Sequence, residues 1–450
     1  MFKKIEIWVL YLVVILGLCF SIGFGILVRQ ELVGTVKLGY VSKWAVTLAE
    51  IPLVLKRIVI NELVMEDRFP GQGGFDGEFL SLESYLLLSR YDGDLSESIV
   101  ELVDLTSFEI VHTWNPHVDS INSLVSNSDP EFEFLTRDQN EQRFGISHPL
   151  LMPDGNLIFQ SNSPLIKIDL CSELVWQNSD DVFHHSNELD GDGNIWVPTH
   201  MFPFAVDEKY VGNNPNEFLD DAITKVSQSG EVLFQKSVAE ILIENGMKHL
   251  VFPAHGKFVF DPLHLNDIQP VLKDSLYWKR GDVFISLKHP SLIVLYRPSS
   301  NELVWSSDGF MSQQHDVDIL NDHQISIFDN NGIHSIKGYV ADDNNRVVIY
   351  DFETNAYSTY LMDSLVVQDV RTITNGRSQI LDTGELLVEE SNFGRSLFFN
   401  ADGTLRWSHV NRASNMKVYP VNWSRILYTE SDIAMVKSIL KEGECEGEPI

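Results

Sequence analysis

The stretch Asn301-Glu-Leu-Val-Trp305, in which a turn residue precedes a short strand that carries an aromatic side chain, is repeated along the chain. The other copies are Ser172-Glu-Leu-Val-Trp176, Ser229-Gly-Glu-Val-Leu-Phe234, Gly403-Thr-Leu-Arg-Trp407 and two weaker ones at 108–114 and 352–360. Similar segments that recur about every 50 to 70 residues are typical of architectures built from one supersecondary unit.

Each copy tends to follow two other short strands separated by turns. Before Ser172, for example, Pro153-Asp-Gly-Asn-Leu-Ile-Phe159 and Leu165-Ile-Lys-Ile-Asp169 read as a turn, a strand and a further strand. Turn, strand, turn, strand and aromatic strand together describe one propeller blade, whereas a sandwich does not explain the recurrence. We therefore predict an all-β, six-bladed or seven-bladed β-propeller, with Trp176, Trp305 and Trp407 buried between neighbouring sheets.

The N-terminus carries the clearest local signal. Lys3 and Lys4 precede an almost uninterrupted apolar run from Ile7 to Val28. As a helix this run reaches about 33 Å, enough to cross the hydrocarbon core of a bilayer. It is long for a signal peptide and lacks a convincing cleavage site, so we predict an uncleaved single-pass anchor through residues 7–28. The two lysines favour a cytoplasmic N-terminus, which places the propeller on the periplasmic or extracytoplasmic side.

These signals divide the chain into four parts. They are a cytoplasmic tip and transmembrane anchor at 1–30, a stalk or linker at 31–74, the propeller at 75–432 and a polar C-terminal tail at 433–450. Within the second part, residues 44–60 are expected to form a stalk or an interfacial helix that Pro52 breaks near its middle. The sequence leaves the oligomeric state open.

Composition excludes some partners. Lys and Arg number 33 against 64 Asp and Glu, giving a net charge of −31, and unaided binding of nucleic acid requires the opposite sign. The carboxylates are scattered, which is typical of ordinary solubility. The three cysteines, Cys19, Cys171 and Cys445, imply no disulfide framework.

Three histidines stand in similar local settings. His185, His264 and His315 each precede polar residues, an apolar run and a turn, so they are expected at equivalent positions of different blades, where they converge on the axis. A single histidine at a strand entry more often closes a turn through a backbone hydrogen bond. Three histidines in matching local settings favour a functional site instead.

Other site chemistries have less support. Three histidines can bind zinc, but their wide separation gives no ligand-spacing signature, and neither a metal nor a cofactor is expected. The chain has no nucleophile elbow for Ser-His-Asp hydrolysis and no glycine-rich phosphate loop.

Four segments resemble motifs of the arylsulfotransferase family, which uses no nucleotide sulfate donor. They are Leu263-His-Leu-Asn-Asp267, Gly281-Asp-Val-Phe-Ile-Ser-Leu287, Gln314-His-Asp316 and Ile327-Phe-Asp-Asn330. The resemblance extends over about 145–410, and it implies a propeller that moves a sulfuryl group from a phenolic sulfate ester to an acceptor hydroxyl through a sulfated histidine. The expected partners are therefore the donor ester and the acceptor, whose identities the sequence leaves open.

The same resemblance suggests a role for each residue. His315 matches the nucleophile, His264 the proton-transfer residue and His185 a residue that holds the sulfuryl oxygens. Lys288 stands where the family usually has a sulfate-clamping Arg, and a lysine supplies charge without the planar fork. Asp316 or Asp267 is expected to orient a ring nitrogen. The alternative function is a non-catalytic, membrane-anchored propeller that acts as a binding or assembly module in the cell envelope.

Overall fold

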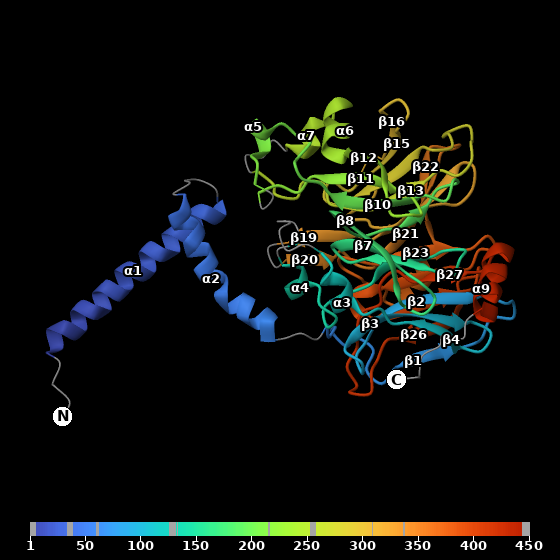
Figure 1. The fold of residues 1–450 in the computed structure, drawn as a ribbon, viewed down its shortest axis with the longest axis horizontal. Coiled ribbons are helices and arrows are strands. Elements are labelled where there is room, and N and C mark those ends of the chain that lie inside the picture. Colours follow the sequence, from blue (N-terminus) through green and yellow to red (C-terminus); the bar gives the residue numbers. More distant parts are fainter. Residues whose placement is uncertain are drawn as a thin grey trace. The chain divides into compact units, whose positions relative to one another are not determined.

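The computed structural model describes residues 6–33, 39–59, 63–125, 132, 134–214, 217–252, 258–307, 309–335 and 338–442. The chain divides into two compact units. The first comprises Met1–Asn61 with His255–Lys257, and the second comprises Glu62–Ala254 and Phe258–Ile450. Figure 1 shows the two helices of the first unit, at the dark-blue end of the colour scale, and the β-rich second unit.

The first unit contains α1 (Ile7–Val33) and α2 (Tyr40–Val59). The segment Ile7–Glu31 of α1 is long and apolar enough to cross a membrane. Pro52 lies inside α2, so the predicted break at this proline is wrong. A proline removes one backbone hydrogen bond, and the turns on either side of Pro52 keep theirs, so the helix continues.

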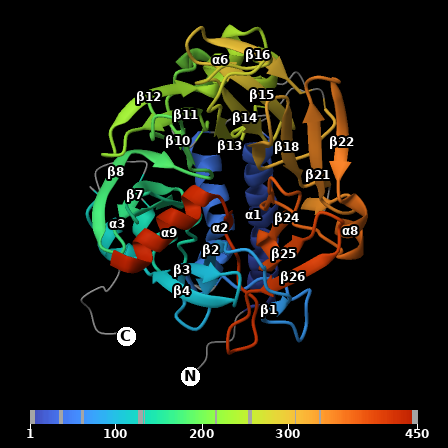
Figure 2. The same cartoon turned by 90° about the vertical axis from the view of Figure 1, so that its right-hand side faces the viewer.

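The second unit is built from antiparallel sheets that follow one another around a ring (Figure 2). One four-stranded sheet contains β27 (Arg425–Leu427), β2 (Tyr85–Asp92), β3 (Glu97–Asp104) and β4 (Glu109–Trp114). The eight-stranded sheet contains β5 (Ser147–Leu151), β6 (Leu157–Gln160), β7 (Ser163–Ile168), β8 (Leu174–Phe183), β9 (Glu188–Leu189), β10 (Ile195–His200), β11 (Asp221–Val226) and β12 (Val232–Ser237).

The remaining sheets continue in chain order. They are β13 (Leu265–Pro270), β14 (Val283–Leu287), β15 (Leu292–Arg297) and β16 (Glu302–Ser306); then β17 (Val317–Ile319), β18 (Gln324–Asp329), β21 (Arg346–Asp351) and β22 (Ala356–Tyr360); then β23 (Arg377–Ile380), β24 (Leu386–Glu390), β25 (Arg395–Phe399), β26 (Leu405–Val410) and β1 (Gly74–Gly77). A hairpin of β19 (Gly332–Ser335) and β20 (Gly338–Ala341) is inserted after β18.

Short helices occupy the connections between these strands. They are α3 (Val118–Asn122), α4 (Leu135–Asp138), α5 (Glu208–Val211), α6 (Val238–Glu244), α7 (Lys248–Val251), α8 (Met362–Val367) and the 3₁₀ turn η2 (Ser391–Phe393). None of them interrupts the order of the sheets.

The mostly β, propeller-like architecture predicted from the repeats is confirmed. The four strong repeats lie on β8, β12, β16 and β26, and the two weak ones overlap β4 and β22, each the last strand of a four-strand run. Trp407 is fully buried and stacks on Phe398 with ring centroids 5.3 Å apart. Trp176 and Trp305 are only partly buried, because an outermost strand has no further strand of its own run beyond it.

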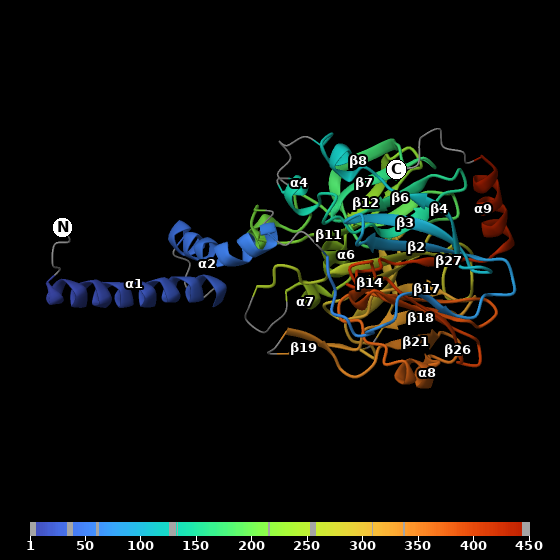
Figure 3. The same cartoon turned by 90° about the horizontal axis from the view of Figure 1, so that it is seen from below.

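Both chain ends of this unit are tied into the ring. β27 pairs with β2 and β1 pairs with β26, so strands from opposite ends of the chain share sheets and close the ring. Residues 433–442, expected in a polar tail, belong instead to α9 (Glu430–Glu442), because Val436 and Ile439 pack into the core. Figure 3 shows this helix at the edge of the unit. Residues 443–450 lie outside the described residues.

Cys171 is disulfide-bonded, which corrects the expectation from the cysteine count. Its partner lies outside the described residues, and Cys19 is a free thiol. Cysteine spacing alone does not reveal which residues the fold brings together.

Hydrogen bonds also join the first, innermost strands of neighbouring four-strand runs. In each of these bonds a polar side chain at a strand entry accepts a backbone N–H group from the next run. The side chain of Ser186 accepts from Ile268 over 3.1 Å, that of Asp267 from Val317 over 2.9 Å, and that of Asp316 from Ser378 over 3.1 Å. All three acceptors are buried. Each follows or lies close to one of the predicted histidines, so the same contacts position the candidate site.

We expect Trp407→Ala to lower the free energy of unfolding by about 3–5 kcal/mol, because it leaves a cavity against Phe398. Leu405→Ala, on the same strand but 38% exposed, is the control and should cost less than about 1 kcal/mol. Urea unfolding of the full-length chain in detergent measures both changes. Equal losses in the two variants would contradict the burial assigned to Trp407.

Candidate active site

The three predicted histidines lie at the entries of innermost strands. His185 precedes β9, His264 precedes β13 and His315 precedes β17. His185 and His264 have φ angles of 58° and 53°, in the left-handed region that residues other than glycine seldom adopt. Such backbone strain persists only where the surroundings hold it, and it clusters at functional sites.

A pocket of about 330 Å³ opens at these strand entries. It is lined by Asn162, His184, His185, His200, Leu219, Asp221, Asp261, His264, Leu265, Lys288, Thr374 and Asn375. Three of the four predicted site residues therefore share one pocket. The fourth, His315, is completely buried and is not among the lining residues.

The hydrogen bonds of Asn330 define the tautomer of His315. The amide NH₂ of Asn330 donates to the main-chain oxygens of Thr372, over 3.2 Å, and Asn375, over 3.0 Å. Its Oδ1 therefore faces His315 Nδ1, 2.6 Å away, and must accept the ring proton. The other nitrogen, Nε2, is left unprotonated, buried and without a hydrogen-bond partner among the described residues. A bare imidazole nitrogen of this kind is a nucleophile.

Burial keeps this imidazole neutral. It lowers the pKa of His315 well below its usual value, and the positive charges of Lys288 and His264 lower it further. Burial likewise lowers the pKa of His185, with His184 and His264 as the next causes. Both rings are therefore uncharged at neutral pH.

His264 is oriented by a residue that the sequence analysis missed. Its Nδ1 lies 2.6 Å from Asp261 Oδ2, and its ring packs on His289 with centroids 4.7 Å apart. The expectation that Asp267 or Asp316 orients a ring nitrogen is wrong, because both carboxylates accept backbone N–H groups of the next strand run. Asp261 and Asn330 orient the rings instead.

Strand pairing places Lys288 beside His264. β13 and β14 are antiparallel with Leu265 opposite Leu287, and the Lys288 N–H donates to the His264 carbonyl over 3.0 Å. The side chain is 5% exposed, and its ammonium lies 5.5 Å from the centre of the Tyr339 ring. Burial lowers the pKa of Lys288, while Asp261 raises it. Lys288 thus places a positive charge in a pocket that also contains the carboxylates of Asp221 and Asp261.

His184, His200 and Asp221 also line the pocket, and no sequence pattern singled them out. His184 contacts His185, with 2.7 Å between their Nδ1 atoms. His200 and Asp221 face each other across β10 and β11. Two groups among the described residues have the composition and spacing to hold a metal ion, this one and Asp261 with His264 and His289. Cross-strand pairing, which brings His200 and Asp221 together, leaves no motif in the sequence.

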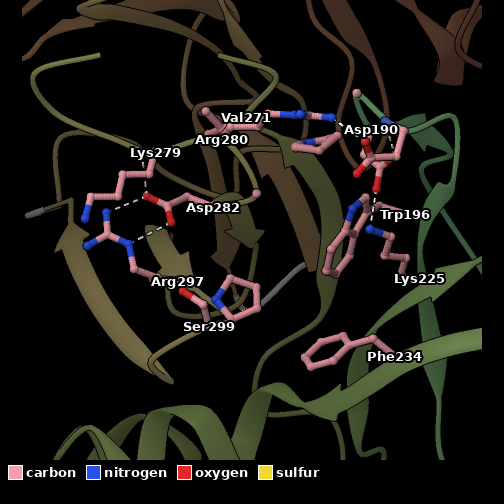
Figure 4. A pocket seen from close by; sticks show the side chains of 15 residues that line it. Asp190, Trp196, Lys225, Phe234, Val271, Lys279, Arg280, Asp282, Arg297 and Ser299 are labelled. Atoms are coloured by element: carbon pink, nitrogen blue, oxygen red, sulfur yellow. Dashed lines mark hydrogen bonds and ion pairs between the residues drawn. The ribbon is translucent and has the colours of Figure 1, made fainter. Parts of the chain in front are cut away.

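A second pocket, of about 320 Å³, lies between β10–β12 and β14–β15 (Figure 4). Six of its charged groups are already paired: Arg297 with Asp282 at 2.7 Å, Lys225 with Asp190 at 2.5 Å, and Arg280 with Asp192. Paired charges are poorly available to a ligand, so the histidine pocket is the better candidate site.

We expect the pH dependence of stability to report the neutral state of His315. Its pKa is depressed in the folded chain, so below about pH 6.5 only the unfolded chain takes up this proton and stability falls as the pH falls. His315→Gln has nothing to protonate and should reduce this slope by up to about 1.4 kcal/mol per pH unit. Urea unfolding between about pH 7 and 5 measures the slope. The exposed His117→Gln is the control, and an unchanged slope in His315→Gln would refute the assignment.

Comparisons with known proteins address the family. A family model described as arylsulfotransferase (ASST) matches residues 148–412, more than half of the chain. No curated protein matches the chain.

Similar solved structures include a protein of unknown function from Bacteroides caccae, with a TM-score of 0.44, 12% identity and coverage of 73% of this chain and 93% of that one. Another is a catalytically inactive variant of virginiamycin B lyase from Staphylococcus aureus with quinupristin, with a TM-score of 0.34, 8% identity and coverage of 60% of this chain and 72% of that one. Kuenenia stuttgartiensis hydrazine synthase has a TM-score of 0.37, 10% identity and coverage of 69% of this chain and 75% of that one. The match over residues 148–412, which contains all four predicted site residues, shows that this chain belongs to the arylsulfotransferase family.

Proposed function

We propose that the chain transfers a sulfuryl group from a phenolic sulfate ester to an acceptor hydroxyl through a sulfated histidine. The observation that carries this proposal is the buried, unpartnered Nε2 of His315, whose lone pair is left free of a proton because Asn330 holds the ring proton on Nδ1. Family membership supports the same class of reaction.

In the first step, His315 Nε2 attacks the sulfur atom of the donor. The bond between nitrogen and sulfur forms while the bond between sulfur and the phenolic oxygen breaks. The departing phenolate takes a proton from His264, whose Nδ1 lies 2.6 Å from Oδ2 of the Asp261 carboxylate. The proton stays on Nδ1 of His315, hydrogen-bonded to Asn330 Oδ1, so the sulfated ring is an imidazolium and a good leaving group.

In the second step, the acceptor hydroxyl attacks the sulfur and returns its proton to the now neutral His264. The nitrogen–sulfur bond breaks, and His315 regains its lone pair. Each group therefore ends the cycle in its starting state.

Lys288 and His185 act on the sulfuryl oxygens. A lysine 5% exposed beside the pocket places a cation where water screens it little, so it stabilises the charge that the oxygens carry in the transition state. His185 provides a ring nitrogen on the same side of the pocket as His264, with ring centroids 5.2 Å apart.

We also infer six blades, with β5–β8 and β9–β12 as separate blades of the eight-stranded sheet, joined where β10 pairs with β8. α1 is proposed to anchor the chain, with the propeller on the extracytoplasmic side. Lys3 and Lys4, which lie next to the apolar run, support this side.

Incubation of the full-length protein with an aryl sulfate and no acceptor should add one sulfuryl group to His315, detected by intact mass at neutral pH. His315→Gln should show no adduct, because glutamine has no nucleophilic nitrogen. His323→Gln, which removes a partly exposed histidine in the turn before β18, is the matched control and should keep the adduct.

An adduct that persists in His315→Gln would overturn the choice of nucleophile. If the wild-type chain neither gains a sulfuryl group nor releases the phenol, the alternative of a non-catalytic binding module is favoured.

Lys288→Met should lower kcat by about 100-fold to 1,000-fold, because it removes a cation from the sulfuryl oxygens. Lys288→Arg keeps the charge and should retain most of the activity. Steady-state release of a chromogenic phenol measures both, with thermal midpoints as the folding control. A methionine variant with the wild-type kcat would rule out this role.

A further inference from the structure

A second cluster in the wall of the histidine pocket takes no part in the proposed transfer. Nε2 of His184 and Nε2 of His200 each lie 3.4 Å from Oδ1 of Asp221. All three ligating atoms lie within 4.8 Å of one another.

The two separations between histidine nitrogen and carboxylate oxygen fit a tetrahedral ion. Zinc bonds of about 2.0–2.1 Å at tetrahedral angles set neighbouring ligand atoms about 3.3–3.4 Å apart. An octahedral ion with similar bonds would require about 3.0 Å. Two imidazoles and one carboxylate are also a ligand set that zinc uses in catalytic sites.

The three side chains are held in place as ligands usually are. Oδ2 of Asp221 accepts the Leu265 N–H over 2.9 Å, which leaves Oδ1 facing the two histidines. His184 and Asp221 are each 2% exposed, and His184 Nε2, 3.4 Å from Asp221 Oδ1, makes no hydrogen bond of good geometry among the described residues. A metal ion would satisfy this buried nitrogen better than the long contact does. The antiparallel register of β10 and β11 fixes His200 opposite Asp221.

We propose that His184, His200 and Asp221 bind a zinc ion whose fourth coordination position opens into the pocket shared with His185, His264 and Lys288. His200 is 26% exposed on the pocket side and leaves room for the fourth ligand. A water molecule or a sulfate-ester oxygen has the donor chemistry for that position.

Metal binding has a consequence for His185, which rests on the proposed function. His184 bound through Nε2 must carry its proton on Nδ1, and that proton points at His185 Nδ1, 2.7 Å away. His185 then accepts on Nδ1 and carries its own proton on Nε2. The zinc site would thereby make His185 a hydrogen-bond donor, the form needed to hold a sulfuryl oxygen.

In the other candidate cluster both histidine Nδ1 atoms are already hydrogen-bonded, so it serves as an internal control. Nδ1 of His264 already lies 2.6 Å from Asp261 Oδ2, and Nδ1 of His289 lies 2.7 Å from the Asp261 carbonyl oxygen. These hydrogen bonds occupy the atoms that face the carboxylate, so no ion is assigned there.

The test titrates the tag-free, full-length protein with Co²⁺ in detergent after treatment with a chelator. We expect the intense visible absorption of tetrahedral cobalt, saturation at one ion per chain and displacement by Zn²⁺. His200→Gln should weaken Co²⁺ binding at least about 100-fold, because it removes one of three ligands. His289→Gln is the matched control and should bind as the wild type does, and thermal midpoints should show that both variants are folded.

Absence of the tetrahedral spectrum in the wild type, or equal binding in the wild type and His200→Gln, would overturn the zinc site. This readout needs no sulfuryl transfer, so it is distinct from a failure of the proposed function. A protein that binds one ion but forms no sulfuryl adduct would support the site and refute only the transfer reaction.

Discussion

The hydrogen bonds between innermost strands of neighbouring four-strand runs are the constraint on which the rest of the structure depends. In each, a buried side chain at a strand entry accepts a backbone N–H from the next run, as Ser186, Asp267 and Asp316 do. A strand edge facing the axis would otherwise leave polar backbone groups unsatisfied away from water. These bonds hold the strand entries together, and the histidines of the pocket are carried on the same entries.

This arrangement places backbone strain and a shifted carboxyl pKa at the strand entries. The left-handed backbone of His185 and His264 is energetically unfavourable, and burial raises the pKa of Asp267. The closed ring compensates through the packing of its sheets. The result is a rigid site in which ring nitrogens are oriented before any ligand arrives, as electrostatic catalysis requires.

The pocket also shows that net charge does not predict local charge. The chain as a whole is strongly acidic, yet the pocket combines Lys288 with a group of imidazoles and with carboxylates that are themselves engaged by N–H donors or histidines. The average surface would repel an anionic sulfate ester, whereas Lys288 in the pocket would attract it. The acidity of the remaining surface is consistent with solubility.

The sequence predicted much of the frame and only part of the site. The aromatic repeats placed the last strand of each run, because hydrophobic patterning and turn residues are local properties. The shared local frame also placed His185, His264 and His315 at strand entries. The sequence did not predict the role of Asp267 and Asp316, which lie near the histidines in the chain but accept N–H groups of the next strand run. It also did not predict α9, whose few apolar residues contact a core only after folding.

By itself, then, the sequence determined the β-rich repeat, the apolar N-terminal helix and the family resemblance, since each of these depends on residues that are close together in the chain. Only the tertiary structure decided that Asn330 orients His315, that Asp261 orients His264 and that His184, His200 and Asp221 share a wall of the pocket. Those contacts arise from strand register and from closure of the ring. Both bring together residues from separate strands and turns, and neither leaves a recognisable motif in the chain.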